Sequence, residues 1–290
     1  MYAKINGTRI FFDVAGKQFV PDGPVMKEKP VCLVLHGGPG SDHSHFLPGI
    51  MPLADTMQLI FVDHRNSGRS DRGPIEQSSM KQNSDDVEAL RQYLGLEKVY
   101  VLGQSYGGMV AQQYGLDYQE HLHGLILVTT APSYRINETA TEIVMRRGTE
   151  EQKELWRKKW AGEIVDFDDY MTRMASLYHC KFEEEDRMEA INSRKRGISN
   201  TEVNNYQRSG ELAVFDFVPV LPKIKCPVLI IGGKEDFVTA AVHSEEMHKA
   251  MTQSELHIVE QSSHSVFSDR PDYVFPVIEE FVNRTFHSNT

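Results

Sequence analysis

Residues 99–108 read VYVLGQSYGG, and this stretch decides which fold the chain can adopt. Four apolar residues, 99–102, form a strand-like run, and a G-x-S-x-G pattern around Ser105 follows at once. A serine on a sharp strand-to-helix turn needs strained backbone, and the neighbouring glycines let the chain pack there without clashes of Cβ atoms. The pattern therefore predicts that Ser105 stands at the end of a buried strand as a candidate nucleophile.

Short apolar runs elsewhere predict further buried strands, at residues 31–35, 59–62, 125–128, 228–231 and 256–259. Val87, Leu90 and Leu94 share one face of a predicted helix. Strands that alternate with helices indicate a mostly parallel sheet covered on both faces. Near the amino terminus, Asn6 and Gly7 lie between two strand-like runs and predict a type I′ hairpin turn.

One region interrupts the alternation of strands and helices. Residues 141–196 hold 13 Asp and Glu and 12 Lys and Arg in 56 positions, nearly twice the charged fraction of the whole chain. A crossover between two parallel strands needs only a dozen or so residues, so we interpret this segment as part of a helical cap. The predicted domains are a core of residues 1–132 and 212–290 and an inserted cap of residues 133–211.

The composition excludes several classes of protein. A hydrophobic fraction of 40% with 25% charged residues is typical of a globular protein. The net charge of −10 argues against nucleic acid or an anionic membrane as the partner. No run of 18 apolar residues and no amino-terminal secretory signal occur in the sequence, so we expect no membrane span and no export.

The cysteines and histidines predict neither a disulfide framework nor a metal site. Cys32, Cys180 and Cys226 are odd in number and widely spaced, which suits a reducing cytoplasm. The histidines near the predicted loops match no zinc spacing, and no phosphate-binding glycine pattern is present. We therefore expect no cofactor, and the sequence specifies no oligomeric state.

A serine hydroxyl is a poor nucleophile until a base removes its proton. His264 follows the last predicted strand and is the candidate base, and Asp236 follows the strand before it and is the candidate acid. The chain order nucleophile, acid, base, here Ser105, Asp236 and His264, is the order found in hydrolases whose serine stands on a strand-to-helix turn. Glu235 and His257 are neighbouring alternatives, but Glu235 fits an exposed loop and His257 lies inside a strand pattern.

Attack on a carbonyl also needs donors for the oxyanion that develops. The amide of Tyr106, directly after the candidate nucleophile, is the first predicted donor. The second should come from the HGGPG loop at residues 36–40, with Gly38 as first choice and Gly37 as second. His36 is interpreted as a residue that orders this loop.

These motifs together resemble the proline iminopeptidase branch of the α/β-hydrolase fold, over most of the chain outside the predicted cap. The residues that carry the resemblance are HGGPG at 36–40, DHRNSGRS at 63–70, GQSYGG at 103–108, GKED at 233–236 and SH at 263–264. The resemblance implies an α/β-hydrolase fold with a mostly parallel central sheet flanked by helices and a helical cap insertion. It also implies a serine peptidase that releases amino-terminal residues, preferably proline.

The chain departs from the family pattern at the positions expected to recognise substrate. Members that select a free amino terminus hold its ammonium with cap-side glutamates, whereas here the cap return at residues 201–206 offers two asparagines. Candidate substrate-binding residues are Phe237, Glu202, Asn205 and Glu211.

Within residues 63–70, His64 and Asn66 also differ from the usual family motif. The expected substrate is a small molecule or short peptide. Alternatives to an aminopeptidase are an esterase, amidase or lactonase (including the acyl-homoserine-lactone type) acting on a neutral acyl group. A non-catalytic small-molecule receptor on the same scaffold is the alternative from another class.

Overall fold

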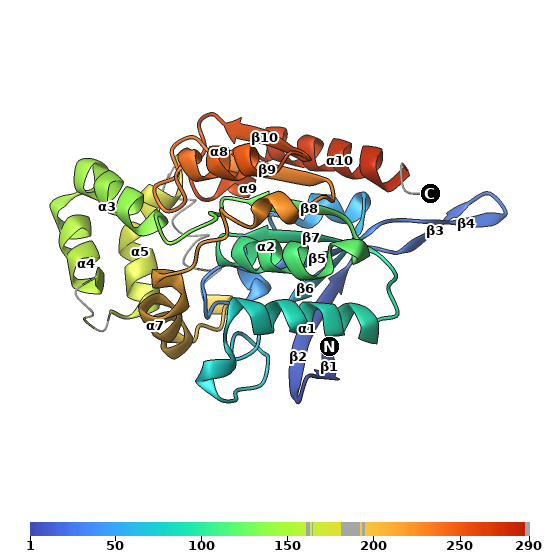
Figure 1. The fold of residues 1–290 in the computed structure, drawn as a ribbon, viewed down its shortest axis with the longest axis horizontal. Coiled ribbons are helices and arrows are strands. Elements are labelled where there is room, and N and C mark those ends of the chain that lie inside the picture. Colours follow the sequence, from blue (N-terminus) through green and yellow to red (C-terminus); the bar gives the residue numbers. More distant parts are fainter. Residues whose placement is uncertain (161–162, 164, 181–191, 193–194, 288–290) are drawn as a thin grey trace.

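The computed structural model describes residues 1–160, 163, 165–180, 192 and 195–287. Its centre is an eight-stranded sheet in the order β1-β2-β6-β5-β7-β8-β9-β10 (Figure 1). The strands are β1 Tyr2–Ile5, β2 Thr8–Ala15, β5 Val31–Leu35, β6 Gln58–Val62, β7 Val99–Gln104, β8 Leu122–Val128, β9 Val228–Gly233 and β10 Ser254–Val259. Strands β5 to β10 pair in parallel, and β1 and β2 add an antiparallel edge. The predicted mostly parallel sheet is confirmed.

Helices cover both faces of the sheet because its central strands are apolar on both sides. Leu33 and Leu35 of β5 pack in the same hydrophobic cluster as helices α1 Met80–Tyr93, α2 Tyr106–Tyr118 and α8 Ala241–Ala250. Cys32 and Val34 point the opposite way, into a cluster with α9 Val266–Asp269 and α10 Pro271–His287. Burial of each such aliphatic side chain contributes about 1.5–3 kcal/mol to stability. This two-sided burial explains why the central strands read as unbroken apolar runs.

Two hairpins lie outside the parallel part of the sheet. The predicted turn at Asn6 and Gly7 is confirmed, with φ angles of 45° and 75° between β1 and β2. A second ribbon, β3 Phe19–Asp22 with β4 Val25–Glu28, was not predicted. It projects from one end of the molecule (Figure 1), and its residues are almost all exposed, so it carries no burial pattern for sequence to reveal.

Between β8 and β9 the chain forms helices α3 Ile136–Arg147, α4 Glu150–Trp160, α5 Phe167–Tyr178 and α7 Thr201–Ser209. They gather at the end of the molecule opposite the β3–β4 ribbon (Figure 1). Apolar side chains from three of these helices, among them Val144, Trp156 and Met174, make a small core of their own. Part of the predicted cap, including residues 181–191, lies outside the described residues, and the limits 133 and 211 stay a prediction.

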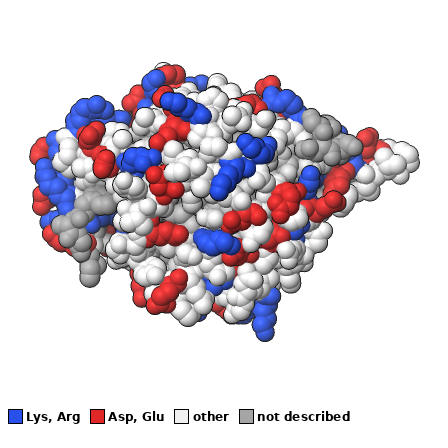
Figure 2. Space-filling model, in the orientation of Figure 1, with Lys and Arg blue, Asp and Glu red and all other residues white. Residues whose placement is uncertain are grey.

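Short 3₁₀ helices complete the described elements: η1 His43–Phe46, η2 Met51–Asp55, η3 Ile75–Gln77, η4 Gln119–His121, η5 Glu211–Ala213 and η6 Leu221–Lys223. On the face shown in Figure 2, acidic and basic side chains are interspersed. Among the helices that the structure describes, none combines the length and apolar composition needed to cross a bilayer.

Candidate active site

Ser105 occupies a strained turn between β7 and α2. Its backbone has φ 55° and ψ −120°, a conformation that residues other than glycine rarely adopt and that costs about 1–3 kcal/mol. Neighbouring strands hold the turn in place: the Ser105 amide donates to the carbonyl oxygens of Val128 and Thr129, each at 3.1 Å. Thr130 Oγ1 donates to the Ser105 carbonyl oxygen at 2.7 Å. The strain is therefore held by the strand next to β7.

Two glycines make this turn possible by close approach. A Cβ atom on Gly103 would lie 2.2 Å from the carbonyl oxygen of Gly107. A Cβ atom on Gly107 would lie 2.2 Å from the carbonyl oxygen of Leu35, at the end of β5. Any side chain at either position would push α2 away from the sheet, which explains the glycines on both sides of the serine.

His264 and Asp236 meet at the carboxyl ends of the last two strands. His264 Nδ1 lies 2.8 Å from Asp236 Oδ2, and both side chains are buried. Thr239 Oγ1 donates to the same carboxylate oxygen at 2.8 Å, and the amides of Val238 and Thr239 donate to Oδ1 at 2.7 and 3.0 Å. Burial acts to raise the pKa of Asp236, but the electrostatic interaction with His264 and the hydrogen bonds from His264 and Thr239 outweigh it and hold the pKa below its ordinary value.

An ionised carboxylate only accepts hydrogen bonds, so Nδ1 of His264 carries a proton and Nε2 is left to act as an acceptor. Among the described residues, no hydrogen bond joins the His264 ring to Ser105 Oγ. Contacts between a nucleophile and its base are often long in structures without substrate. Gln104, the residue before Ser105, does link the serine turn to the loop that carries His264, because its Nε2 donates to the His264 carbonyl oxygen at 3.1 Å.

The two neighbouring alternatives lie elsewhere. Glu235 has a half-exposed side chain that pairs with Arg147 at 3.5 Å. His257 lies on β10 with its Nδ1 3.0 Å from the hydroxyl of Tyr273. Sequence alone does not identify Thr239, although an Asp side chain commonly accepts from backbone amides that follow it in a turn.

The HGGPG loop lies directly over the serine. A Cβ atom on Gly37 would be 3.1 Å from Ser105 Cβ and 3.7 Å from Ser105 Oγ. His36 orders the loop: its Nδ1 lies 2.7 Å from the Gly37 carbonyl oxygen, and its Nε2 accepts from the His64 amide at 3.1 Å. Because a backbone amide only donates, Nε2 is unprotonated, and burial lowers the pKa of His36 in keeping with a neutral ring.

A cavity opens above Ser105 between the core and the cap. Gly38, Ser105 and Tyr106 line it from the core, and the described cap residues that line it include Trp156, Tyr170, Tyr178 and Arg208. The described lining residues are mostly apolar or aromatic, Arg208 is the charged one, and they include neither Asp nor Glu. The sequence did not point to Arg208.

None of the four residues predicted to bind substrate is among the described residues that line this cavity. Phe237 is fully buried and packs beneath two of the lining rings, 6.2 Å from Trp156 and 4.9 Å from Tyr178 between ring centroids. Glu202 and Asn205 are exposed on α7, and Glu211 Oε2 accepts from the Met80 amide at the start of α1 at 2.8 Å. Their contact with substrate stays a prediction.

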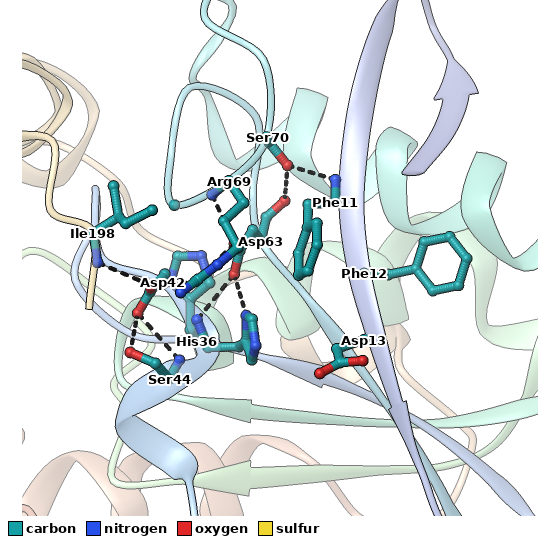
Figure 3. Close-up of polar contacts among 12 residues, drawn as sticks. Phe11, Phe12, Asp13, His36, Asp42, Ser44, Asp63, Arg69, Ser70 and Ile198 are labelled. Atoms are coloured by element: carbon teal, nitrogen blue, oxygen red, sulfur yellow. Dashed lines mark hydrogen bonds and ion pairs between the residues drawn. The ribbon is translucent and has the colours of Figure 1, made fainter. Parts of the chain in front are cut away.

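A second buried carboxylate, Asp63, braces the segment that follows the HGGPG loop (Figure 3). Asp63 Oδ1 accepts from the His43 amide at 2.9 Å and lies 2.7 Å from His43 Nδ1, while Oδ2 accepts from the Arg69 amide at 2.8 Å. Burial alone would raise the pKa of Asp63, but these contacts lower it to about 2. Asp63 therefore stays ionised and joins the segments around His43 and Arg69.

The two departures from the family motif have simple structural explanations. His64 contributes its backbone amide to His36, a role open to other residue types. Asn66 adopts φ 60°, in the region where glycine is the usual residue and asparagine is tolerated best. Its side chain is satisfied there, donating to Ser78 Oγ at 2.8 Å and accepting from the Gly73 amide at 2.6 Å.

Replacement of Asp63 by asparagine is expected to lower the free energy of unfolding by about 2 kcal/mol at pH 7. A carboxyl whose pKa falls to about 2 on folding stabilises the protein above its unfolded pKa, about 3.8, and this stabilisation is lost as the pH falls toward 2. About half of the difference from wild type should remain at pH 3. Urea unfolding between pH 7 and pH 3 measures it. Asp13→Asn, at an exposed carboxylate on β2 (Figure 3), is the control, and an equal loss in both variants would contradict the argument.

Several known proteins are similar to this chain over most of its length. The proline iminopeptidase PfmaB of Pestalotiopsis fici is 28% identical over 98% of this chain and 99% of its own. The proline iminopeptidase of Saccharolobus solfataricus is 31% identical over 89% of this chain and 86% of its own. A crystal structure of a proline iminopeptidase from Mycobacterium smegmatis matches with a TM-score of 0.79 at 21% identity, covering 100% of this chain and 99% of that one.

Residues 30–271 match the family model of the alpha/beta hydrolase fold, a span that runs from the first inner strand past the candidate base. The mostly parallel eight-stranded sheet with helices on both faces is consistent with that match. The chain belongs to the α/β-hydrolase fold family.

Proposed function

We propose that this chain is a serine hydrolase that cleaves an amide or ester bond through an acyl-enzyme on Ser105. The observation that carries the proposal is the buried hydrogen bond from His264 Nδ1 to Asp236 at 2.8 Å, at the same sheet edge as a serine on a strained turn. This is the set of groups that acyl transfer needs: a nucleophile, a base and an acid that orients the base.

In the proposed reaction, His264 Nε2 takes the proton of Ser105 Oγ while the oxygen attacks the substrate carbonyl. Asp236 holds the imidazole in the required tautomer and stabilises the imidazolium. The amides of Tyr106 and of Gly38 or Gly37 receive the negative charge on the carbonyl oxygen. His264 then protonates the leaving group, and water, activated by the same imidazole, releases the acyl group from Ser105.

The relatives support an aminoacyl substrate. Two proteins named proline iminopeptidase match nearly the whole chain, so we propose aminopeptidase activity toward a short peptide or small aminoacyl amide, with proline as the preferred first residue. A cytosolic location is part of the proposal. The unpaired state of Cys32, Cys180 and Cys226 supports it.

One observation favours a broader substrate range, which includes neutral esters or lactones. The described residues lining the cavity offer an ammonium group no carboxylate, and their charged member is the cation Arg208. A carboxylate in contact with the ammonium would contribute a few kcal/mol in a partly dry site, enough for about a hundredfold preference. We therefore propose that a free amino group is not the main determinant of binding.

N-acetylation of a good prolyl substrate is expected to reduce kcat/KM by less than about tenfold. The test compares prolyl and N-acetylprolyl amides that share one leaving group, with a simple ester and an acyl lactone assayed beside them. Glu202→Gln is the matched variant, because Glu202 is exposed on α7 and is one of the two carboxylates predicted from the sequence to bind substrate.

A loss above about a hundredfold, abolished in Glu202→Gln or Glu211→Gln, would contradict the broad range and establish a strict aminopeptidase. Turnover of the ester or lactone without turnover of the prolyl amide would select the esterase or lactonase alternative. Absence of turnover on every substrate, with Ser105 unreactive toward a fluorophosphonate, would instead support a receptor.

A further inference from the structure

We propose that Asn204, on cap helix α7, is a positioning residue that holds the HGGPG loop in the geometry required for oxyanion binding. This inference rests on the proposed serine hydrolase function, because it concerns the amides of Gly37 and Gly38. It assigns to the cap a part in catalysis that is separate from enclosing the substrate.

The central contact joins the cap to the loop by one buried side chain. Asn204 is 3% exposed, and its Nδ2 donates to the carbonyl oxygen of Pro39 at 2.9 Å. The Pro39 carbonyl belongs to the Pro39–Gly40 peptide group, two peptide groups along the chain from the one that carries the amide of Gly38. This hydrogen bond therefore holds the segment that directly follows the predicted oxyanion donor. Loss of such a hydrogen bond is costly, because it leaves the buried carbonyl oxygen of Pro39 without a donor.

The following peptide group is held by the same part of the cap. The amide of Asn200, the residue just before α7, donates to the Gly40 carbonyl oxygen at 2.7 Å. Gly40 has φ 85°, and a Cβ atom there would lie 2.4 Å from the carbonyl oxygen of Asn200. The start of α7 therefore sits directly on the backbone of the loop, with no space for a side chain between them.

A salt-bridged cluster behind the loop completes its attachment to the cap (Figure 3). Asp42 Oδ2 accepts from Arg69 Nη1 at 2.6 Å and from the amide of Ile198 at 2.9 Å. Ile198 belongs to the chain that leads into α7. Thus His36 holds the first residues of the loop to the core, and the cap holds the carbonyl oxygens of Pro39 and Gly40.

Asn204 also contacts a residue that lines the cavity, Arg208, through the oxygen of its amide. Its Oδ1 accepts from Arg208 Nε at 3.1 Å, and Arg208 lines the cavity together with Gly38 and Ser105. The two ends of the amide make separate contacts, so substitution can separate them. Asn204→Asp keeps an oxygen for Arg208 but removes the donor to Pro39, whereas Asn204→Ala removes both contacts.

The test measures steady-state kinetics and the binding of a transition-state analogue by Asn204→Asp and Asn204→Ala. Both variants are expected to lower kcat about ten- to hundredfold while KM changes less than about threefold, because the oxyanion forms only after substrate has bound. The inhibition constant of an acyl trifluoromethyl ketone, which places an oxyanion in the site, should weaken by the same factor as kcat. Binding of the leaving-group product, which carries no oxyanion, should stay the same.

Asn283→Asp on the exposed side of α10, on the opposite face of the sheet from α2, controls for an added carboxylate and should behave as wild type. Normal kcat in Asn204→Asp with a loss only in Asn204→Ala would overturn the proposal and assign the effect to Arg208. A rise in KM with unchanged kcat in both variants would overturn it as well. If Asn204→Asp does not fold, the test uses Asn204→Ala alone. The proposal then requires that the analogue binds more weakly relative to the product than it does in wild type, because partial misfolding lowers the binding of both equally.

Ser105→Ala is assayed in parallel to separate the two proposals. If it retains activity, the serine hydrolase function itself fails. If it is inactive and the Asn204 variants match wild type, only the positioning role of Asn204 fails.

Discussion

Ser105→Ala is expected to reduce kcat/KM by about four to six orders of magnitude, the range seen when the nucleophile of a serine–histidine–aspartate set is removed. The remaining groups cannot form an acyl-enzyme, so any residual rate would come from oxyanion binding and substrate orientation alone. Alanine differs from serine by one oxygen and leaves the backbone contacts of the turn, with Val128, Thr129 and Thr130, in place. The fold should therefore survive.

The measurement combines initial rates with intact mass after treatment with a fluorophosphonate. Wild type should gain one adduct, located on the peptide that contains Ser105, and the alanine variant should gain none. Ser209→Ala, at an exposed serine on α7, is the control and should keep both activity and labelling. Near-normal turnover by Ser105→Ala, with an unchanged melting temperature, would contradict the assignment of the nucleophile.

The parts of the fold that sequence predicted are those set by local signals. The strand that leads to Ser105 is buried on both faces, so its residues are apolar without interruption. The Asn6–Gly7 turn was equally clear, because few residue pairs tolerate two positive φ angles. The β3–β4 ribbon was missed for the opposite reason: almost all of its side chains are exposed, so its sequence has no alternation of apolar and polar residues that burial would impose.

The parts of the site that sequence did not reveal depend on contacts between distant segments. Asn204 and Pro39 are 165 positions apart, and only the folded chain brings the amide of one to the carbonyl of the other. Phe237 was expected in the pocket wall because it follows Asp236, but its ring lies in the small core of the cap, beneath Trp156 and Tyr178. A position next to Asp236 in the sequence fixes where the backbone of Phe237 lies, but not the direction in which its side chain packs.

Asp236→Asn is expected to reduce kcat by about three to four orders of magnitude, although aspartate and asparagine side chains have nearly the same shape. The reason lies in the donors around the carboxylate. Oδ1 accepts from two backbone amides, those of Val238 and Thr239, and these donors cannot reverse. The oxygen of an asparagine must therefore take the Oδ1 position, and its NH₂ group must take the Oδ2 position, facing His264 Nδ1.

An NH₂ group at that position donates to Nδ1, so the imidazole proton moves to Nε2, the atom that must accept the proton of Ser105. The base is then present in the wrong tautomer. Thr239→Val, which removes the hydroxyl that donates to Oδ2 at 2.8 Å but leaves the carboxylate, should cost only about tenfold. Glu235→Gln, at the neighbouring half-exposed carboxylate, should cost almost nothing. A loss below about tenfold in Asp236→Asn, or a larger loss in Glu235→Gln, would mean that the acid of the site is another residue.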